Sequence, residues 1–173
     1  MSAACGARAR VLVREADVED LPGLLQIYNE VIAHSTAVYS DTAVTLAERL
    51  QWWRARTAQG YPVLVAGEPA DILGFATFGD FRSWPGYRYT VEHTVHVRDD
   101  CRARGIGREL MQVLLGRAAA CGKHMMIGAI DAANAASIRF HERLGFTRAA
   151  VLREVGYKFD RWLDLLFMQR ELP

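Results

Sequence analysis

The spacing of the apolar residues changes at Gly105, and this change constrains the fold more than any other feature of the chain. Before it, residues 89–97 are rich in Val and Thr, which favour a strand. Beyond it, apolar residues recur on one helical face as far as Cys121, and Gly122 supplies the residue type that commonly ends a helix. Residues 125–131 have a second strand pattern. A strand, a helix and a strand in this order predict a parallel β-α-β crossover.

Two helices are predicted before this unit. The first follows Asp17, a candidate N-cap, and its apolar face comprises Leu21, Leu24, Leu25, Tyr28, Val31 and Ile32. The second begins at the capping box formed by Thr45 and Glu48 and ends near Gly60. Helical turns that carry apolar residues on one side only must pack against another layer, which here is a sheet.

The remaining segments favour strands, apart from one short helix that Asn134 caps and Gly145 closes. The predicted strands are 11–13, 62–66, 72–81, 89–97, 125–131, 146–157 and 162–169, and a loop occupies 83–86. The order β, α, α, β, β, β, α, β, α, β, β combines a parallel crossover with antiparallel hairpins. We therefore expect an α/β fold with a mixed sheet and helices on both faces.

Length and composition set further limits. The chain has 173 residues, 51% hydrophobic and 24% charged, with a formal net charge of +1. These values predict a single domain over 10–173, with a tail at 1–9, and no nucleic-acid or membrane partner. No apolar run approaches the roughly 18 residues of a membrane span, and no secretory signal is evident. Three cysteines without metal-like spacing, Cys5, Cys101 and Cys121, favour reduced thiols and a cytoplasmic location.

The loop from Arg102 to Gly107 is the strongest candidate for a binding site. It joins a strand to the first turn of a helix, where backbone N–H groups have no partner within the helix and the helix dipole attracts anions. Gly105 and Gly107 allow close approach to the backbone, and Arg104 and Arg108 add positive charge. A diphosphate suits this loop. A Walker A loop and a dinucleotide fingerprint do not match, and a solvated βα turn is the alternative.

Two motifs together resemble the GNAT N-acetyltransferase superfamily. Arg102, Gly105 and Gly107 match its pyrophosphate pattern, Gln/Arg-x-x-Gly-x-Gly/Ala, and Asn134 with residues 141–146 resembles its second signature. The resemblance implies the GNAT fold, a mixed, mostly antiparallel sheet whose fourth and fifth strands splay apart, and it implies acetyl-CoA as co-substrate. The acetyl-CoA residues that it implies are Val95, His96, Val97, Arg102, Ala103, Arg104, Gly105, Ile106, Gly107, Arg108, Asn134 and Ser137. Ala103 is a departure, since many relatives have glycine there.

A narrower resemblance covers most of the chain. Residues 60–66, 78–82, 87–93 and 161–164 resemble the acetyltransferases of phosphinothricin and of methionine sulfoximine and methionine sulfone. That family acetylates the α-amino group of small amino acid analogues, and its members are usually homodimers. The substrate residues that the resemblance implies are Arg82, Ser83, Trp84, Glu92, His93 and Thr94. Arg82 is the candidate clamp for the substrate carboxylate, with an ordinary surface arginine as the alternative. Tyr157 and Lys158 are further candidates for the border of this pocket.

Glu92 and His141 are the candidate catalytic residues. Amide formation needs a neutral amine, and Glu92 lies on the strand that the resemblance places beside the thioester, so it is the candidate general base. The alternative is a strand-face glutamate paired with Arg88. His141 stands where many GNAT enzymes have a tyrosine, and it can protonate the departing thiolate or serve a structural role.

A metal site is not expected. His93 and His96 are three apart on a strand and point to opposite faces, so they cannot readily bind one ion. The alternatives for the function are a GNAT enzyme for another amine, such as a protein N-terminus or a polyamine, and a non-catalytic acyl-CoA sensor. A nucleotide-binding module is disfavoured, because the Walker lysine and the third glycine are missing.

Overall fold

The computed structural model describes residues 11–173. Its elements follow the predicted order, with three 3-10 turns added at 18–20, 85–87 and 99–101. The helices are α1 (Leu21–His34), α2 (Leu46–Ala58), α3 (Ile106–Ala120) and α4 (Ala135–Arg143). The strands are β1 (Val13–Glu15), β2 (Val63–Glu68), β3 (Asp71–Asp80), β4 (Thr90–Val97), β5 (Met125–Asp131), β6 (Thr147–Lys158) and β7 (Arg161–Glu171).

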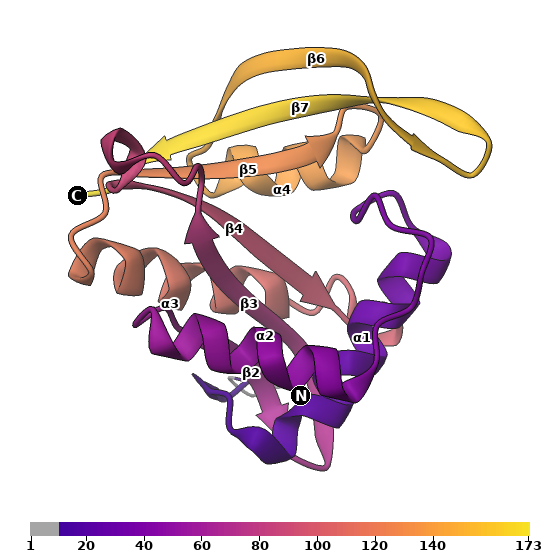
Figure 1. Cartoon of the computed structure of the whole chain (residues 1–173), viewed down its shortest axis with the longest axis vertical. Coiled ribbons are helices and arrows are strands. Elements are labelled where there is room, and N and C mark those ends of the chain that lie inside the picture. The colour runs from indigo at the N-terminus through magenta and orange to yellow at the C-terminus, as the bar shows by residue number, and fades with distance from the viewer. Residues whose placement is uncertain (1–10) are drawn as a thin grey trace, which may run out of the picture.

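The strands form one mixed sheet in the order β1-β2-β3-β4-β5-β7-β6, and only the β4–β5 pair is parallel. Helices cover both faces, as predicted (Figure 1). One core cluster joins α1 and α2 to β2 and β3 through residues such as Leu24, Val65 and Phe75. A larger cluster on the opposite face joins α3 and α4 to the central strands through residues such as Leu110, Ile138 and Met126. The sheet is therefore the middle of three layers.

The pairing of β4 with β5 ends early. Only Thr90, Val91 and Glu92 pair with β5, opposite Met125 to Ile127. Beyond that point β4 continues beside β3 as far as Val97, while β5 continues beside β7 as far as Asp131. The two strands diverge in Figure 1, with β4 running toward the lower right and β5 along the upper part of the molecule. The predicted splay of the fourth and fifth strands is confirmed.

The start of the chain differs from the prediction in two ways. The first strand begins at Val13 rather than at residue 11. Asp17 caps the 3-10 turn at 18–20, and α1 begins only afterwards, at Leu21. The cause is Asp20, whose buried carboxylate accepts hydrogen bonds from Arg14 and from the Asp17 N–H, so that a separate turn forms first. The predicted tail at 1–9 and Cys5 lie outside the described residues.

Lys158, at the end of β6, fastens the C-terminal hairpin to the loop after α1. Its side chain is 1% exposed. Its Nζ donates hydrogen bonds to the carbonyl oxygens of Ile32, Ser35 and Val38, at 2.6, 2.8 and 2.8 Å. Carbonyls at the C-terminus of a helix lack partners within the helix, so an ammonium group suits them. The amine is thus fully engaged with backbone, whereas the Tyr157 side chain is exposed and packs edge-on against Trp162.

Replacing Lys158 with Met should lower the free energy of unfolding by about 2–4 kcal/mol, because buried carbonyls would lose their donors. Urea denaturation followed by circular dichroism measures this change. Arg161→Met, at an exposed position in the same hairpin, is the control and should shift stability by less than about 0.5 kcal/mol. Equal effects of the two substitutions would show that the hydrogen bonds of Lys158 contribute nothing specific.

Candidate active site

The N-terminus of α3 is free to bind an anion. Gly105, with a φ of 90°, occupies the N-cap position, and no side chain caps the helix there. The first N–H groups of this 15-residue helix therefore have no partner within it. Arg102 forms an ion pair with Asp99 at 2.6 Å, and Arg104 donates to the Asp100 carbonyl at 3.0 Å. Exposed ion pairs of this kind are weak and exchange readily. The loop fits a diphosphate.

Ala103 adopts the left-handed conformation, with a φ of 62°. The methyl group of alanine is tolerated without strain only at a negative φ. Having alanine here, where many relatives have glycine, therefore costs conformational free energy. For a residue with a Cβ atom, this conformation costs roughly 1–2 kcal/mol. The strain lies within the loop that faces the predicted pyrophosphate.

Ala103→Gly should therefore stabilise the fold by about 0.5–1 kcal/mol and lower the KM for acetyl-CoA. Thermal unfolding and thiol-release kinetics measure the two effects. Ala55→Gly, at an exposed position inside α2, is the matched control and should destabilise by about 1 kcal/mol. A destabilised Ala103→Gly protein would contradict the assignment of strain to this residue.

Past Glu92, β4 has an edge that β5 does not cover. Val95 and Val97 pack against the core on the α3 side. The His96 ring points to the opposite face and lies edge-on to Phe75, with a centroid distance of 5.3 Å. Burial and the nearby Arg49 lower the pKa of His96 to about 4, so this ring is neutral. The backbone edge from 95 to 97 has no partner strand on its β5 side, which is the arrangement that an extended pantetheine arm requires.

Asn134 and Ser137 form the first turn of α4. The Asn134 carboxamide oxygen accepts a hydrogen bond from the Ser137 N–H at 3.0 Å, as expected for an N-cap. The carbonyl oxygen of Ser137 then accepts a hydrogen bond from Nδ1 of His141 at 2.7 Å. The N-terminal turn of α4 therefore fixes the orientation of the candidate acid.

His141 and His93 form a buried pair of stacked rings. Because a carbonyl can only accept, Nδ1 of His141 must carry its hydrogen, and Nε2 of the neutral ring is an acceptor. That Nε2 lies 3.2 Å from Nε2 of His93, which is then the donor. Burial lowers the pKa of both rings, well below the usual value for His93, and keeps them neutral. Among residues 11–173, Nδ1 of His93 is a buried acceptor without a hydrogen-bond partner.

Glycine at 128 makes room for this pair on β5. A methyl group there would lie 3.0 Å from Nε2 of His93 and 3.4 Å from the His141 ring. The histidines thus stand against β5 just past Ile127, the last residue that it pairs with β4.

Glu92 points to the other face of β4. It is half-buried, and burial raises the pKa of its carboxyl, an effect that Arg82 and Arg56 partly oppose. Its partner on β3 is Gly79, and the Arg56 guanidinium occupies the space that a side chain at 79 would need. Arg88, the alternative partner, donates instead to the Pro85 carbonyl and lies over the Tyr89 ring.

The loop with Arg82, Ser83 and Trp84 is exposed. The Arg82 guanidinium stacks on Phe81, 4.3 Å from the ring centroid, and donates to the Phe81 carbonyl. Trp84 is 71% exposed. Thr94, by contrast, lies two residues from Glu92 on the same face and lines a cavity of about 370 Å³ between α1, α2 and the sheet. Of the predicted substrate residues, Thr94 lines this cavity, whereas Glu92 and the loop lie outside its lining. Glu92 is linked to the cavity through Arg56, a lining residue whose charge acts on its carboxyl.

The sequence reasoning missed the α2 side of this cavity. Its lining includes Tyr28 from α1 and Arg49, Trp52 and Arg56 from α2. These three α2 residues are three and four apart, so they share one helical face. That face is turned toward the sheet although it carries two arginines. The sequence signal that could have identified this wall was the presence of charged residues, Arg49 and Arg56, at inward positions of an amphipathic helix.

The two candidate catalytic residues thus lie on opposite sides of β4. His93 and His141 face α3 and α4, on the side of the uncapped α3 terminus. Glu92 and Thr94 are on the side of α1 and α2, where Thr94 lines the 370 Å³ cavity and Glu92 lies near its Arg56. Past Glu92, β4 and β5 are no longer paired with each other. A thioester placed along this open edge of β4 would lie between the two sets of side chains.

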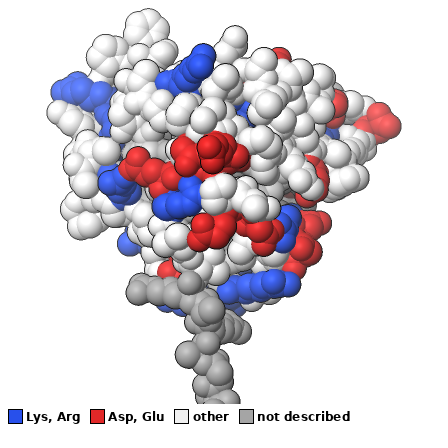
Figure 2. Space-filling model, turned by 90° about the horizontal axis from the view of Figure 1, so that it is seen from below, with Lys and Arg blue, Asp and Glu red and all other residues white. Residues whose placement is uncertain are grey.

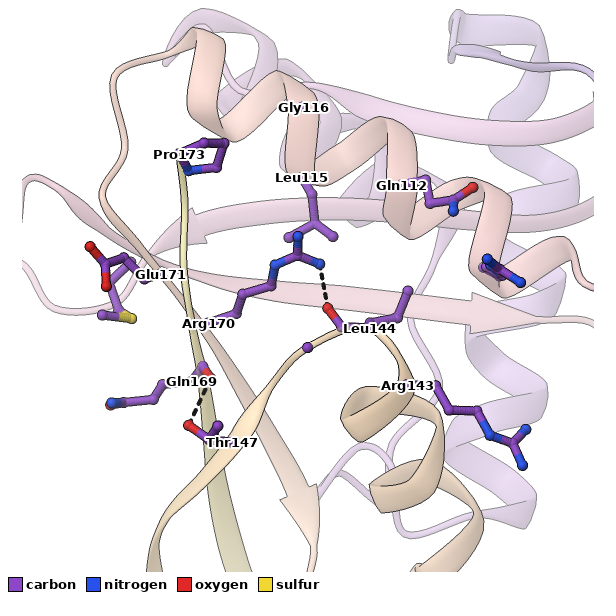
Figure 3. Close-up of a pocket in the computed structure, with 13 residues that line it drawn as sticks. Gln112, Leu115, Gly116, Arg143, Leu144, Thr147, Gln169, Arg170, Glu171 and Pro173 are labelled. Carbon is purple, nitrogen blue, oxygen red and sulfur yellow. Dashed lines mark hydrogen bonds between the residues drawn. The ribbon is translucent and has the colours of Figure 1, made fainter.

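A larger cavity, of about 860 Å³, lies elsewhere. It is bounded by α3, the end of α4 and the end of β7, and of the predicted site it includes only Arg108 (Figure 3). The Arg170 side chain points across it to the Leu144 carbonyl and donates a hydrogen bond there. This cavity contains neither candidate catalytic residue.

In the part of the chain that the structure describes, no cluster of three His, Cys, Asp or Glu side chains could hold a metal ion. None of the described helices is long and apolar enough to cross a bilayer. Acidic and basic side chains lie interspersed on the face that Figure 2 shows.

The split sheet beside an uncapped helix terminus places this protein among the acetyl-CoA-dependent N-acetyltransferases. Residues 24–146 match the Acetyltransferase (GNAT) family, and the chain belongs to that family. GNAT acetyltransferases use acetyl-CoA, as the resemblance implied.

Two curated relatives are similar over nearly the whole chain. An L-methionine sulfoximine/L-methionine sulfone acetyltransferase of Pseudomonas paraeruginosa is 52% identical over 161 residues, covering 92% of this chain and 94% of the relative. A phosphinothricin N-acetyltransferase of Alcaligenes faecalis is 34% identical over 171 residues, covering 96% of this chain and 85% of the relative.

A solved structure also matches. The phosphinothricin acetyltransferase of Sinorhizobium meliloti in complex with AcCoA has a TM-score of 0.90 and 36% identity, covering 94% of this chain and 88% of that one.

Proposed function

We propose that this protein transfers an acetyl group from acetyl-CoA to the α-amino group of a small amino acid analogue, such as methionine sulfoximine, methionine sulfone or phosphinothricin. The observation that carries the proposal is the half-buried Glu92 at the point where β4 leaves β5, beside a cavity of about 370 Å³ that contains Arg49 and Arg56. Carboxylate-bearing acceptors suit such a cavity. A polyamine does not, because its cations would meet two arginines. The names of the relatives support the same class of acceptor.

The residues that would hold acetyl-CoA lie on the α3 side. The free N–H groups at the start of α3 and the arginines at 102, 104 and 108 suit the pyrophosphate. The open edge of β4 from Val95 to Val97 suits the pantetheine arm, and Asn134 and Ser137 border the arm on the α4 side. The bound molecule supplies an acetyl thioester. A backbone N–H on the open edge of β4 would stabilise the charge that develops on the carbonyl oxygen.

Glu92 acts as the general base in this proposal. Burial raises the pKa of its carboxyl, which makes it a better proton acceptor, while Arg82 and Arg56 oppose part of that rise. It removes the first proton from the ammonium group of the acceptor, directly or through water. Arg82, whose charge acts on Glu92, lies in the exposed loop with Ser83 and Trp84.

Glu92→Gln should lower kcat by roughly 10²–10⁴, because the amine would lose its base. In the wild type, activity should fall as the pH drops through the Glu92 pKa, which lies above the usual value for glutamate, because only the ionised carboxylate accepts a proton. This acidic limb should be absent from the pH profile of Glu92→Gln. Stopped assays of CoA release over a pH series measure both effects. Full activity in the variant would remove Glu92 from the mechanism.

The histidine pair provides the second proton transfer. A proton from the attacking nitrogen enters at the unpartnered Nδ1 of His93, and the Nε2 hydrogen of His93 passes to Nε2 of His141. His141 then gives that hydrogen to the thiolate of CoA. The N–H bond of the acceptor breaks and an S–H bond forms, so the protons balance. His141 is the acid, and His93 relays the proton to it.

His93→Phe preserves the aromatic packing and removes the relay. It should lower kcat about 10- to 100-fold and leave the KM for acetyl-CoA within about twofold. His124→Phe, at an exposed histidine, is the control and should have no effect on kcat. An unchanged kcat in His93→Phe would exclude the relay.

A thiol-release assay with acetyl-CoA over a panel of amino acid analogues tests the function as a whole. We expect methionine sulfone, methionine sulfoximine or phosphinothricin to stimulate CoA release more than polyamines or peptides do. Stimulation by polyamines or by peptide N-termini alone would favour the other GNAT activities. No stimulation by any acceptor would leave the chain as an acyl-CoA sensor.

We also propose a homodimer. The whole length of β6 before Gly156 is exposed, and the exposed side chains of the β6–β7 hairpin include Val151, Leu152, Val155 and Trp162. An apolar edge strand of this length is usually covered. Light scattering coupled to gel filtration measures the mass, and a monomer would exclude the proposal.

A further inference from the structure

Arg49 is a buried cation without an anion. The residue is 4% exposed, and its Nε has no hydrogen-bond partner among the described residues. Its guanidinium carbon lies 3.8 Å from the Tyr28 ring centroid and 4.6 Å from the Trp52 ring. Aromatic faces attract a cation without accepting from its N–H groups, and the Tyr28 hydroxyl, which also interacts with Arg49, is not an anion. Burial lowers the pKa of Arg49, as expected for a positive charge removed from water.

The neighbouring carboxylate is already used. Glu48 accepts hydrogen bonds from both the N–H and the hydroxyl of Thr45, in the capping box of α2. His96, on the sheet below, is neutral and cannot compensate the charge. A buried charge normally has a paired partner, because an unpaired one costs several kcal/mol. The described residues therefore supply no anionic partner for Arg49.

The position of Arg49 indicates which molecule could provide the missing anion. The guanidinium lines the 370 Å³ cavity together with Thr94 and Arg56. Arg56 acts on Glu92 at one end of this space, and Arg49 lies seven residues earlier on the same helix, about 10 Å away along its axis. Thr94 lies between them, two residues beyond Glu92 on β4. A small molecule with its amine near Glu92 can therefore extend to Arg49.

We propose that Arg49 binds the α-carboxylate of the acceptor amino acid. This inference rests on the proposed function and adds the group that selects amino acids over simple amines. Of the polar groups of methionine sulfone, only the carboxylate is an anion, since the sulfone is neutral. A guanidinium offers a carboxylate two parallel hydrogen bonds, and burial strengthens the pair. Arg82, the candidate from the sequence, lies in an exposed loop and already donates to a carbonyl.

The test compares methionine sulfone with its carboxamide, which lacks the negative charge. The measured quantity is the ratio of kcat/KM for the acid to kcat/KM for the amide, because the amine pKa differs between the two molecules and cancels when proteins are compared. Arg49→Met should lower this ratio about 100-fold, with little change for the amide. The KM for acetyl-CoA should not change.

Three further variants sharpen the result. Arg54→Met, at an exposed arginine on the same helix, is the matched control and should keep the wild-type ratio. Arg49→Lys, which keeps the charge without the planar fork, should retain part of the ratio and guards against a folding defect in Arg49→Met. Arg82→Met should keep the ratio. Loss of the ratio in Arg82→Met but not in Arg49→Met would overturn the assignment.

An equal loss for acid and amide in Arg49→Met would also overturn it, since Arg49 would then contact some other part of the acceptor. If the wild type acetylates neither molecule, the proposed function fails by itself. Calorimetric titration of methionine sulfone into the CoA-bound protein then still tests Arg49. Binding to the wild type and to Arg54→Met, but not to Arg49→Met, would support the carboxylate site, and equal binding to all three would exclude it.

Discussion

The early end of the β4–β5 ladder is the constraint on which the site depends. Three residue pairs join these strands, and beyond Glu92 each strand keeps a partner on one side only. Buried backbone groups without hydrogen-bond partners cost free energy. The seam, meaning the unpaired edges of β4 and β5 in the middle of the sheet, therefore needs polar groups or a ligand beside it. The protein places buried imidazoles on one side of this seam and a polar cavity on the other. Sheet geometry alone therefore creates both binding surfaces.

The seam also separates two electrostatic tasks. On the α3 side, a helix terminus and arginines attract phosphate, while neutral histidines occupy the dry interior. On the α2 side, Glu92 lies among cations that limit the rise of its pKa on burial. Alternation of side chains along β4 produces this division, since Glu92 and His93 are neighbours in sequence and point to opposite faces. In the proposed mechanism, one strand thus carries both the base and the histidine of the relay.

Much of the fold was predictable because its signals are local. Period changes at Gly105, the capping box at Thr45 and the glycines at 122 and 145 mark element boundaries, and all appear in the structure. Local signals could not predict that β4 and β5 diverge or that acetyl-CoA is the co-substrate, and both predictions came from the resemblance to the GNAT superfamily. The glycine that many relatives have at position 103 was the available signal for the left-handed conformation of Ala103. The full engagement of Lys158 could not be predicted, because it depends on contacts distant in sequence. Arg49 escaped notice for the same reason: burial of an arginine is a property of packing.

The hydrogen bonds of Lys158 have a consequence for the order in which the protein can be completed. Val44, in the wall of the proposed acceptor cavity, is held to α1 by two hydrogen bonds with Asn29, one donated by each residue. The segment between α1 and Val44 is held by Lys158. During synthesis α1 is complete more than a hundred residues before that lysine, and α2 about a hundred residues before it. The wall of the proposed acceptor cavity therefore reaches its final shape only when the last hairpin is made, so a chain truncated before β6 would lack a finished acceptor pocket.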